Sequence, residues 1–381
     1  MTLRHYLQLK TRTPAFLWRM VIGILAVGIV GGFLVEGRFR SPPNLAEMLR
    51  PFVDAPDPLQ RLAEDGKWLE LWWTIPEVAY LQRLSAGPVA LAIFSGCWWL
   101  AFCMQAAHVP RRSEPGRPAP GAHNPQLWLL PLAVLLGALS IWPTHFLSLW
   151  IEVRWNIEPS AELAKGLRYF ILGVGVPEEL AKLLCFLPLV PILLRIRSDL
   201  TALIAAGCVG LGFAVVENMG YFHGSRGGDV VGRFLTANPF HMTLTGVAGL
   251  ALYRAARDPR GWGPQAVAMV GLMIFAHGLY DATIVIPELV DVAILGSIIF
   301  ALVVYQFFRE MRDLRTPRSE TISLTATFLA GVSTVTAATF IYVSGLLDFQ
   351  QACDVMAMNV LSLSLMAYLF LREMPETMVT V

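Results

Sequence analysis

Charged side chains are scarce in this chain. Only 15% of its 381 residues are Asp, Glu, Lys or Arg, whereas 55% are hydrophobic, and the mean hydropathy is +0.57. Such a composition is typical of a polytopic membrane protein and argues against a soluble enzyme. The net charge of +1 argues against a nucleic-acid partner. The sequence therefore predicts an all-α polytopic protein whose surroundings are the lipid bilayer.

Cysteine is scarce too, and two hydrolase signatures are missing. The five cysteines stand in apolar runs without the paired spacing of a metal site, so we expect them to be small core side chains. No His-Glu-x-x-His sequence occurs, which excludes a zincin. No Gly-x-Ser-x-Gly sequence occurs, which argues against a serine hydrolase. Any hydrolytic chemistry must therefore use other groups.

Apolar runs of roughly 20 residues, long enough to cross a bilayer, recur along the chain. They predict about ten spans in three parts: an N-terminal membrane region at 1–168 with an outer loop at 36–87, a core of four helices at 169–286, and a C-terminal membrane region at 287–381. The predicted spans are 15–35, 88–106, 127–150, 169–194, 200–222, 234–253, 264–286, 289–308, 323–345 and 351–371.

Lys and Arg gather in alternate loops. Six groups, before span one and after spans two, four, six, eight and ten, fall on one side if both termini are cytoplasmic. The loop at 153–168 is an exception, because it carries Arg154, Lys165 and Arg168 on the other side. The sequence therefore predicts a multi-pass protein of the cytoplasmic membrane with both termini in the cytoplasm.

Four short polar clusters interrupt spans four to seven, where each ionisable group costs roughly 2.5–3.5 kcal/mol to insert. Several such groups on four consecutive spans indicate a polar site, and their types are those of acid–base or metal chemistry. The clusters are Glu178-Glu179-Leu180-Ala181-Lys182, Glu217-Asn218-Met219-Gly220-Tyr221, His241 with Thr245, and His277 with Asp281.

The first cluster combines a carboxylate pair with a lysine. Glu178 and Lys182 are four residues apart on one helical face and can neutralise each other. Glu179 points about 100° away and is expected to be less directly matched by the lysine. A structural Glu–Lys bridge would explain Glu178 and Lys182 but not Glu179, whereas paired carboxylates suit general acid–base catalysis. We also expect Pro177 to loosen the backbone before the pair.

The other clusters put polar groups one turn apart. Asp281 can fix the tautomer of His277 and raise its basicity, whether the ring acts as a base or as a metal ligand. Glu217 and Tyr221 share a face, and for Asn218 and Tyr221 interhelical hydrogen bonding is the preferred interpretation. All four clusters fall within about 15 Å of the outer surface, which predicts one polar layer in the outer half of the membrane.

The order and spacing of these clusters resemble the PrsW family of intramembrane proteases, which is distantly related to the CAAX-type prenyl-peptidases. The motifs are Glu-Glu-x-x-Lys, Glu-Asn-x-x-Tyr preceded by Phe213-Ala214, and one histidine on each of the next two helices, all within residues 170–285. The resemblance implies a protease-like core that cuts membrane-tethered proteins near the outer face of the membrane, and site-1-type cleavage of an anti-sigma factor is one such reaction.

The resemblance also implies roles for the polar residues. Glu178 or Glu179 would activate water, and His241 and His277 would stabilise the oxyanion or bind a metal ion. The residues expected to support them are Lys182, Glu217, Asn218, Tyr221 and Asp281.

Two mechanisms remain open at this point. A divalent metal such as zinc could be held by residues drawn from Glu178 or Glu179, Glu217, His241, His277 and Asp281. Without a required cofactor, a carboxylate can be the general base and a histidine the electrophile. The adjacent glutamates with Lys182 slightly favour this glutamic-type mechanism.

Two other functions are compatible with intramembrane ionisable groups. A proton- or ion-coupled transporter predicts inverted repeats and broken helices at mid-membrane depth, and neither is evident in the sequence. A non-catalytic membrane scaffold predicts a degraded set of motifs, whereas the set here is complete. The isolated polar residues Arg19, His145 and Asp354 are expected to be structural.

Overall fold

The computed structural model describes residues 3–39, 58–80, 85–107, 126–290, 292, 294–315, 322–357 and 360–373. Every regular element in these ranges is a helix, which confirms the predicted all-α polytopic fold. Residues 40–57 and 81–84 of the predicted outer loop lie outside the described part. The elements are α1 (Leu3–Lys10), α2 (Pro14–Val35), α4 (Pro58–Glu64), α5 (Trp68–Tyr80), α6 (Ala86–Ala107), α7 (Gln126–Leu139), α8 (Ile141–Trp155), α9 (Leu163–Arg168), η1 (Tyr169–Gly175), α10 (Val176–Phe186), η2 (Leu187–Leu189), α11 (Val190–Ile196), α12 (Asp199–Gly224), α13 (Val230–Leu235), α14 (Ala237–Arg257), α15 (Pro259–Val285), α16 (Pro287–Val290), α17 (Ile294–Leu314), α18 (Leu324–Leu346), α19 (Phe349–Ala357) and α20 (Val360–Glu373).

Seven helical stretches in the described ranges are long and apolar enough to cross a membrane. The predicted fourth, sixth and tenth spans are not among them. The fourth changes helix type along its length, the sixth corresponds to the polar helix α14, and the tenth includes residues 358 and 359, which lie outside the described part. The count of ten spans therefore stays a prediction. The seven stretches are Pro14–Val35, Ala86–Ala107, Trp128–Trp155, Asp199–Gly224, Pro259–Val285, Ile294–Leu314 and Leu324–Leu346.

The predicted fourth span is helical but irregular. It begins as the π-helix η1 and continues through α10, the 3-10 turn η2 and α11. Pro177 lacks a backbone N–H and its ring crowds the carbonyl group four residues earlier, so a wider turn before it relieves the crowding. The broken helix that a transporter predicts is not seen in this span, because the chain stays helical from 169 to 196 through its changes of helix type.

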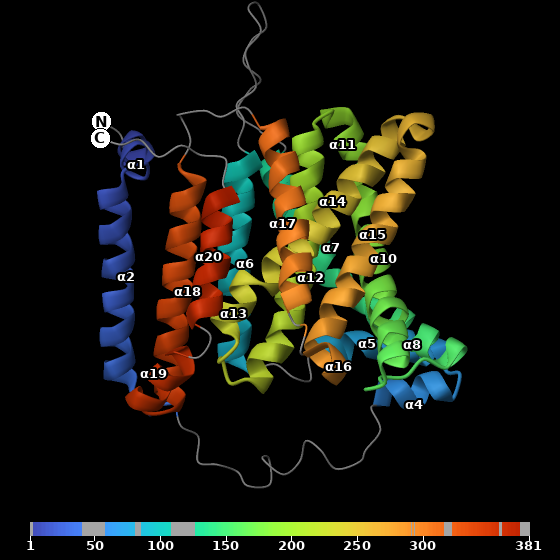
Figure 1. The fold of residues 1–381 in the computed structure, drawn as a ribbon, viewed down its shortest axis with the longest axis horizontal. Coiled ribbons are helices and arrows are strands. Elements are labelled where there is room, and N and C mark those ends of the chain that lie inside the picture. The colour runs from blue at the N-terminus through green and yellow to red at the C-terminus, as the bar shows by residue number, and fades with distance from the viewer. Residues whose placement is uncertain are drawn as a thin grey trace, which may run out of the picture.

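α12 is the most enclosed of the seven candidate spans, since 83% of its apolar stretch is buried. It lies centrally in the bundle, with α6, α7 and α14 packed along it (Figure 1). By contrast, α2 is 11% buried and packs along α18 at the edge of the bundle. The core of the molecule is therefore built around α12, which carries the second polar cluster.

Two glycines set the distances between the helices that carry histidine. A Cβ atom at Gly210 of α12 would collide with the carbonyl oxygen of His241 on α14. A Cβ atom at Gly278 of α15 would lie 2.5 Å from the carbonyl oxygen of Phe170 in η1. Because neither glycine has a side chain, α14 and α15 approach α12 and η1 closely enough for their polar groups to meet.

α4, α5, α16 and α19 lie at one end of the bundle, and α1 and α11 lie at the other (Figure 1). α5 packs on α8 through Trp72 and Trp142, whose ring centroids are 4.9 Å apart, and Trp142 Nε1 donates to the carbonyl oxygen of Trp72 at 2.7 Å.

Two further expectations stay predictions. They are the three-part division at 1–168, 169–286 and 287–381, and the orientation in the membrane.

Candidate active site

The four polar clusters meet in one largely buried network. They come from α10, α12, α14 and α15, which lie next to one another in the bundle. The sequence predicted one polar layer, and the structure brings the side chains into direct contact; their depth in a bilayer stays a prediction. The members are Glu178, Glu179, Lys182, Glu217, His241, His277 and Asp281.

Lys182 is at the centre of the network and is fully buried. Its Nζ atom lies 3.2 Å from Glu178 Oε2, 2.8 Å from Glu179 Oε1 and 2.9 Å from His241 Nδ1. An ammonium group has three N–H donors, so these three acceptors saturate it. The predicted Glu178–Lys182 pair is present, but the expectation that Lys182 matches Glu179 less directly is wrong, because the i+3 contact to Glu179 is the shorter of the two.

The contacts of His241 assign its proton. Since Lys182 donates to Nδ1, the proton of the neutral ring is on Nε2, which lies 3.0 Å from Glu217 Oε2 and donates to it. Thr245, paired with His241 by sequence, donates instead to Glu179 Oε2 at 3.3 Å. His241 is thus held from both sides, by a cation on one nitrogen and a carboxylate on the other.

His277 lies among three carboxylates. Its Nδ1 atom is 2.8 Å from Glu179 Oε1, whereas Nε2 is 3.4 Å from Asp281 Oδ2 and 3.6 Å from Glu178 Oε2. A hydrogen bond from Nδ1 to Glu179 leaves Nε2 facing Glu178 and Asp281. The predicted pairing of Asp281 with His277 is present, and Glu179 orients the ring from the other side.

The adjacent glutamates have different surroundings. The side chain of Glu179 is 0% exposed, and its two oxygens are engaged by Lys182, His277 and Thr245. The side chain of Glu178 is 15% exposed and lines a cavity of about 340 Å³. The other walls of this cavity come from α4, α5, α8 and α12, and they include His145, whose Nδ1 bonds the Ile141 carbonyl oxygen at 2.9 Å.

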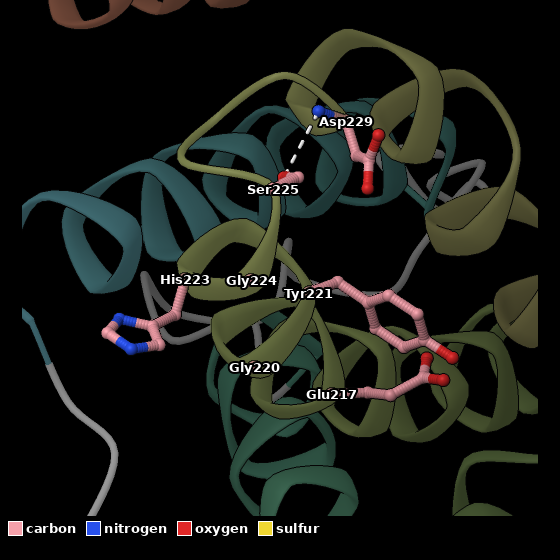
Figure 2. Close-up of a pocket in the computed structure, with 7 residues that line it drawn as sticks. All are labelled: Glu217, Gly220, Tyr221, His223, Gly224, Ser225 and Asp229. Atoms are coloured by element: carbon pink, nitrogen blue, oxygen red, sulfur yellow. Dashed lines mark hydrogen bonds between the residues drawn. The ribbon is translucent and has the colours of Figure 1, made fainter. Parts of the chain in front are cut away.

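A second cavity, of about 880 Å³, adjoins the first at the end of α12. The two share Glu217, Gly220 and Tyr221 as lining residues. Figure 2 shows the carboxylate of Glu217 beside the ring of Tyr221, while His223 points away from both. Both cavities therefore border the end of α12, and the smaller one reaches the carboxylate of Glu178.

Arg233 of α13 belongs to the network and was missed by sequence reasoning, which counted it as a loop charge. Its Nη2 lies 2.9 Å from Glu217 Oε2, its Nε donates to Asn218 Oδ1, and its guanidinium carbon lies 3.5 Å from the centre of the Tyr221 ring. The one feature that could have pointed to Arg233 was its position in a predicted outer loop, because arginine is less common in outer loops than in cytoplasmic ones.

Asn218 and Tyr221 differ in how they connect helices. Asn218 makes the interhelical hydrogen bonding expected of it, because its Nδ2 donates to Asn238 Oδ1 on α14 at 2.7 Å. Tyr221 is 49% exposed, and its contact to another helix is the stacked guanidinium of Arg233. Both residues of the second cluster thus connect α12 to the elements that follow it.

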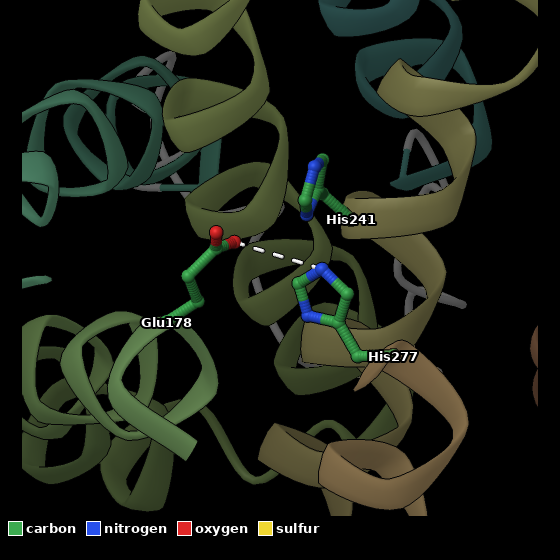
Figure 3. A group of neighbouring side chains, drawn as sticks. All are labelled: Glu178, His241 and His277. Carbon is green, nitrogen blue, oxygen red and sulfur yellow. Dashed lines mark ion pairs between the residues drawn. The ribbon is translucent and has the colours of Figure 1, made fainter. Parts of the chain in front are cut away.

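Three residues of the site suit a divalent metal ion. Glu178, His241 and His277 each offer one ligand atom, and these atoms lie within 4.8 Å of one another (Figure 3). Two histidines and a glutamate are a ligand set of catalytic zinc, and the contact of Glu179 with His277 Nδ1 is the usual outer support of such a ligand. Of the candidate ligands, Glu178, His241 and His277 are in this group, whereas Glu179, Glu217 and Asp281 are not.

Comparison with known proteins gives one match. Residues 125–307 match the family described as PrsW family intramembrane metalloprotease. This region is wider than the 170–285 that carries the motifs, because it also includes α7, α8 and much of α17. No curated protein and no solved structure matches the chain. The match over residues 125–307 confirms the resemblance to the PrsW family that the four polar motifs predicted.

Proposed function

We propose that this protein is an intramembrane endopeptidase that hydrolyses peptide bonds of membrane-tethered proteins. The main support is that Glu178 lines a cavity, whereas Glu179 does not, and that Glu178 lies beside His241 and His277. The family match supports an intramembrane peptidase. The substrate would reach Glu178 by way of the two cavities that border the end of α12.

Glu178 is the proposed general base. Its carboxylate takes a proton from a water molecule as the water oxygen attacks the scissile carbonyl carbon, and it later gives that proton to the amine that leaves. Glu179 is proposed to position the site rather than to react, because both of its oxygens are engaged by Lys182, His277 and Thr245. Lys182 would hold the two carboxylates in place through its contacts with both.

The histidines are proposed to stabilise the tetrahedral oxyanion. This role requires His277 as the imidazolium, which donates from Nδ1 to Glu179 and presents its Nε2–H on the side of Glu178, 3.6 Å from that carboxylate, where the oxyanion would form. His241 presents an N–H from Nε2, which is donated to Glu217 in the resting arrangement. Both rings are already oriented by buried partners, so little reorganisation is needed during the reaction.

A metal-dependent mechanism is the second candidate, favoured by the grouping of Glu178, His241 and His277 and by the family description. These three residues would hold the ion, which would polarise the scissile carbonyl and activate water. Binding through His241 Nε2 has to displace the proton that the contact with Lys182 places there. For this reason we favour the glutamic-type mechanism.

The proposed substrates are single-pass proteins cut near the outer face of the cytoplasmic membrane, with membrane-tethered anti-sigma factors as one class. The test is cleavage of a panel of tagged single-pass proteins from the native host by purified enzyme in liposomes. We expect wild type and the control Glu162→Gln, an exposed residue paired with Lys165, to cut the same substrate. Glu178→Gln and His277→Ala should leave it intact.

The same assay separates the alternatives. Under the glutamic-type mechanism, cleavage continues after treatment with a metal chelator; loss of cleavage that zinc restores would instead establish the metal-dependent mechanism. If wild type and variants give equal patterns, the peptidase proposal is wrong. Substrate-dependent proton flux across the liposome membrane would then support a transporter.

A further inference from the structure

Arg233 connects all three polar residues of the second cluster. Its guanidinium group binds Glu217 Oε2 through Nη2 at 2.9 Å, binds Asn218 Oδ1 through Nε, and stacks on the Tyr221 ring at 3.5 Å. Glu217, Asn218 and Tyr221 therefore share one partner, although that partner lies 16 residues after Glu217 in the chain. The spacing of the cluster on α12 is matched to this arginine.

The position of Arg233 is fixed by the helix that carries it. α13 has six residues, and Val230, Val231, Phe234 and Leu235 are buried against the bundle. The backbone of α13 packs on α14 and α18. Arg233 lies on the remaining face, where its side chain is 19% exposed. The apolar face thus anchors α13 while its arginine reaches across to α12.

Glu217 connects Arg233 to the reaction site. The same oxygen, Oε2, accepts from Arg233 Nη2 and from His241 Nε2 at 3.0 Å. The Glu217 side chain is 22% exposed and lines both cavities, so it has room to rotate away from His241. A planar guanidinium that binds Glu217, binds Asn218 and stacks on Tyr221 removes that freedom, and a lysine ammonium could not make all three contacts.

We propose that Arg233 is a positioning residue, which holds Glu217 so that this carboxylate keeps the His241 ring oriented with its proton on Nε2. The proposal rests on the proposed peptidase function for its effect on rate. Its structural part does not, because the state of the His241 ring can be measured in an inactive protein. Arg233 itself would touch neither the substrate nor the reacting atoms.

The first test is NMR of ¹⁵N-histidine-labelled protein in detergent micelles, with the His241 signals assigned from their loss in His241→Ala. We expect wild type to show His241 with a proton on Nε2. Arg233→Met should shift this signal or lose it to exchange with water, as should Glu217→Gln. Arg168→Met, which removes an exposed arginine bonded to the Trp155 carbonyl oxygen, is the matched control and should change nothing.

An unchanged His241 signal in Arg233→Met, together with a changed signal in Glu217→Gln, would overturn the proposal. Should Arg233→Met fail to fold, Arg233→Lys keeps the charge but loses the paired contacts with Asn218 and Tyr221. The His241 signal should then shift in the same direction by a smaller amount. A wild-type signal in Arg233→Lys would show that charge alone suffices and that the three-point contact is not used.

The second test is a double-mutant cycle on the rate of cleavage. Removing an outer support of a catalytic ligand typically costs about 10- to 100-fold, so we expect Arg233→Met to lower kcat by about tenfold with KM little changed. Adding Arg233→Met to Glu217→Gln should cost little more, because both act through one contact. Independent, multiplied losses would contradict the proposal, whereas absence of cleavage in wild type would count against the peptidase function and leave the NMR result standing.

Discussion

Glu178 and Glu179 are neighbours in the chain, yet they face different surroundings. The α10 helix turns Glu179 towards Lys182 and His277 in the interior, whereas Glu178 also reaches the cavity. Lys182 contacts both carboxylates, but the two differ in exposure and in the number of side chains that they bind. A charge-neutral substitution at each position should therefore have separable effects.

We expect Glu178→Gln to abolish cleavage, a loss of about 10²- to 10⁴-fold for a general base, with thermal stability close to that of wild type. Glu179→Gln should lower stability by about 3–5 kcal/mol, because it removes a buried partner of Lys182 and His277. Cleavage rates and thermal unfolding in the same detergent measure both effects. A stable, active Glu178→Gln would contradict the assignment of the base, whereas a Glu179→Gln that unfolds like wild type would contradict the positioning role of Glu179.

Sequence periodicity could predict that these residues share a site, but not which contacts they make. The i+4 rule favoured Glu178 as the partner of Lys182, and the structure adds a shorter i+3 contact to Glu179. Arg233 could not be found from spacing, because it joins the network from a separate helix after a turn. Contacts of that kind depend on how α13 packs against the bundle, and the local pattern of the sequence does not specify this packing.

At the level of elements, helix length and composition predicted α12 and α15 well, because both are long and apolar. For the fourth span they predicted a helix but not its changes of helix type, although Pro177 marked where the regular helix is interrupted. The approach of α14 to α12 at Gly210 also depends on atomic packing. The sequence shows several glycines on this helix, but it does not show which neighbouring helix packs closely against Gly210.

The C-terminal end of α12 carries a further prediction. Gly220 lines both cavities, and a Cβ atom there would meet nothing within 4 Å among the described residues. Gly220→Trp should therefore fold but fill the proposed path of the substrate. We expect its kcat/KM to fall by about tenfold, which corresponds to about 1.4 kcal/mol. Unfolding temperature should stay near that of wild type.

The matched control is Gly271→Trp, at a helical glycine of α15 that is equally open but lines neither cavity. It should leave both cleavage and stability near wild type. Equal loss of cleavage in the two variants would mean that the tryptophan acts through the helix or the membrane. Unchanged cleavage in Gly220→Trp would show that the substrate reaches Glu178 by another route.

At the scale of the whole molecule, the cavities at the candidate site lie towards one end of the bundle. The larger cavity is lined by Ser225 and Asp229 just beyond α12, and the smaller one by residues of α4 and α5. α4 and α5 lie at the end opposite α1 and α11 (Figure 1). The orientation of the bundle therefore decides on which side of the membrane the proposed cleavage takes place.

The distribution of Lys and Arg predicts that this end faces outwards. An impermeant maleimide added to intact cells should label Ser225→Cys, at the larger cavity, and should not label Asp313→Cys, near the end of α17, until the cells are opened. Wild type, with its five cysteines, gives the background for both variants. The reverse labelling pattern would show that the site faces the cytoplasm. The proposed substrates would then have to be cut on their cytoplasmic side.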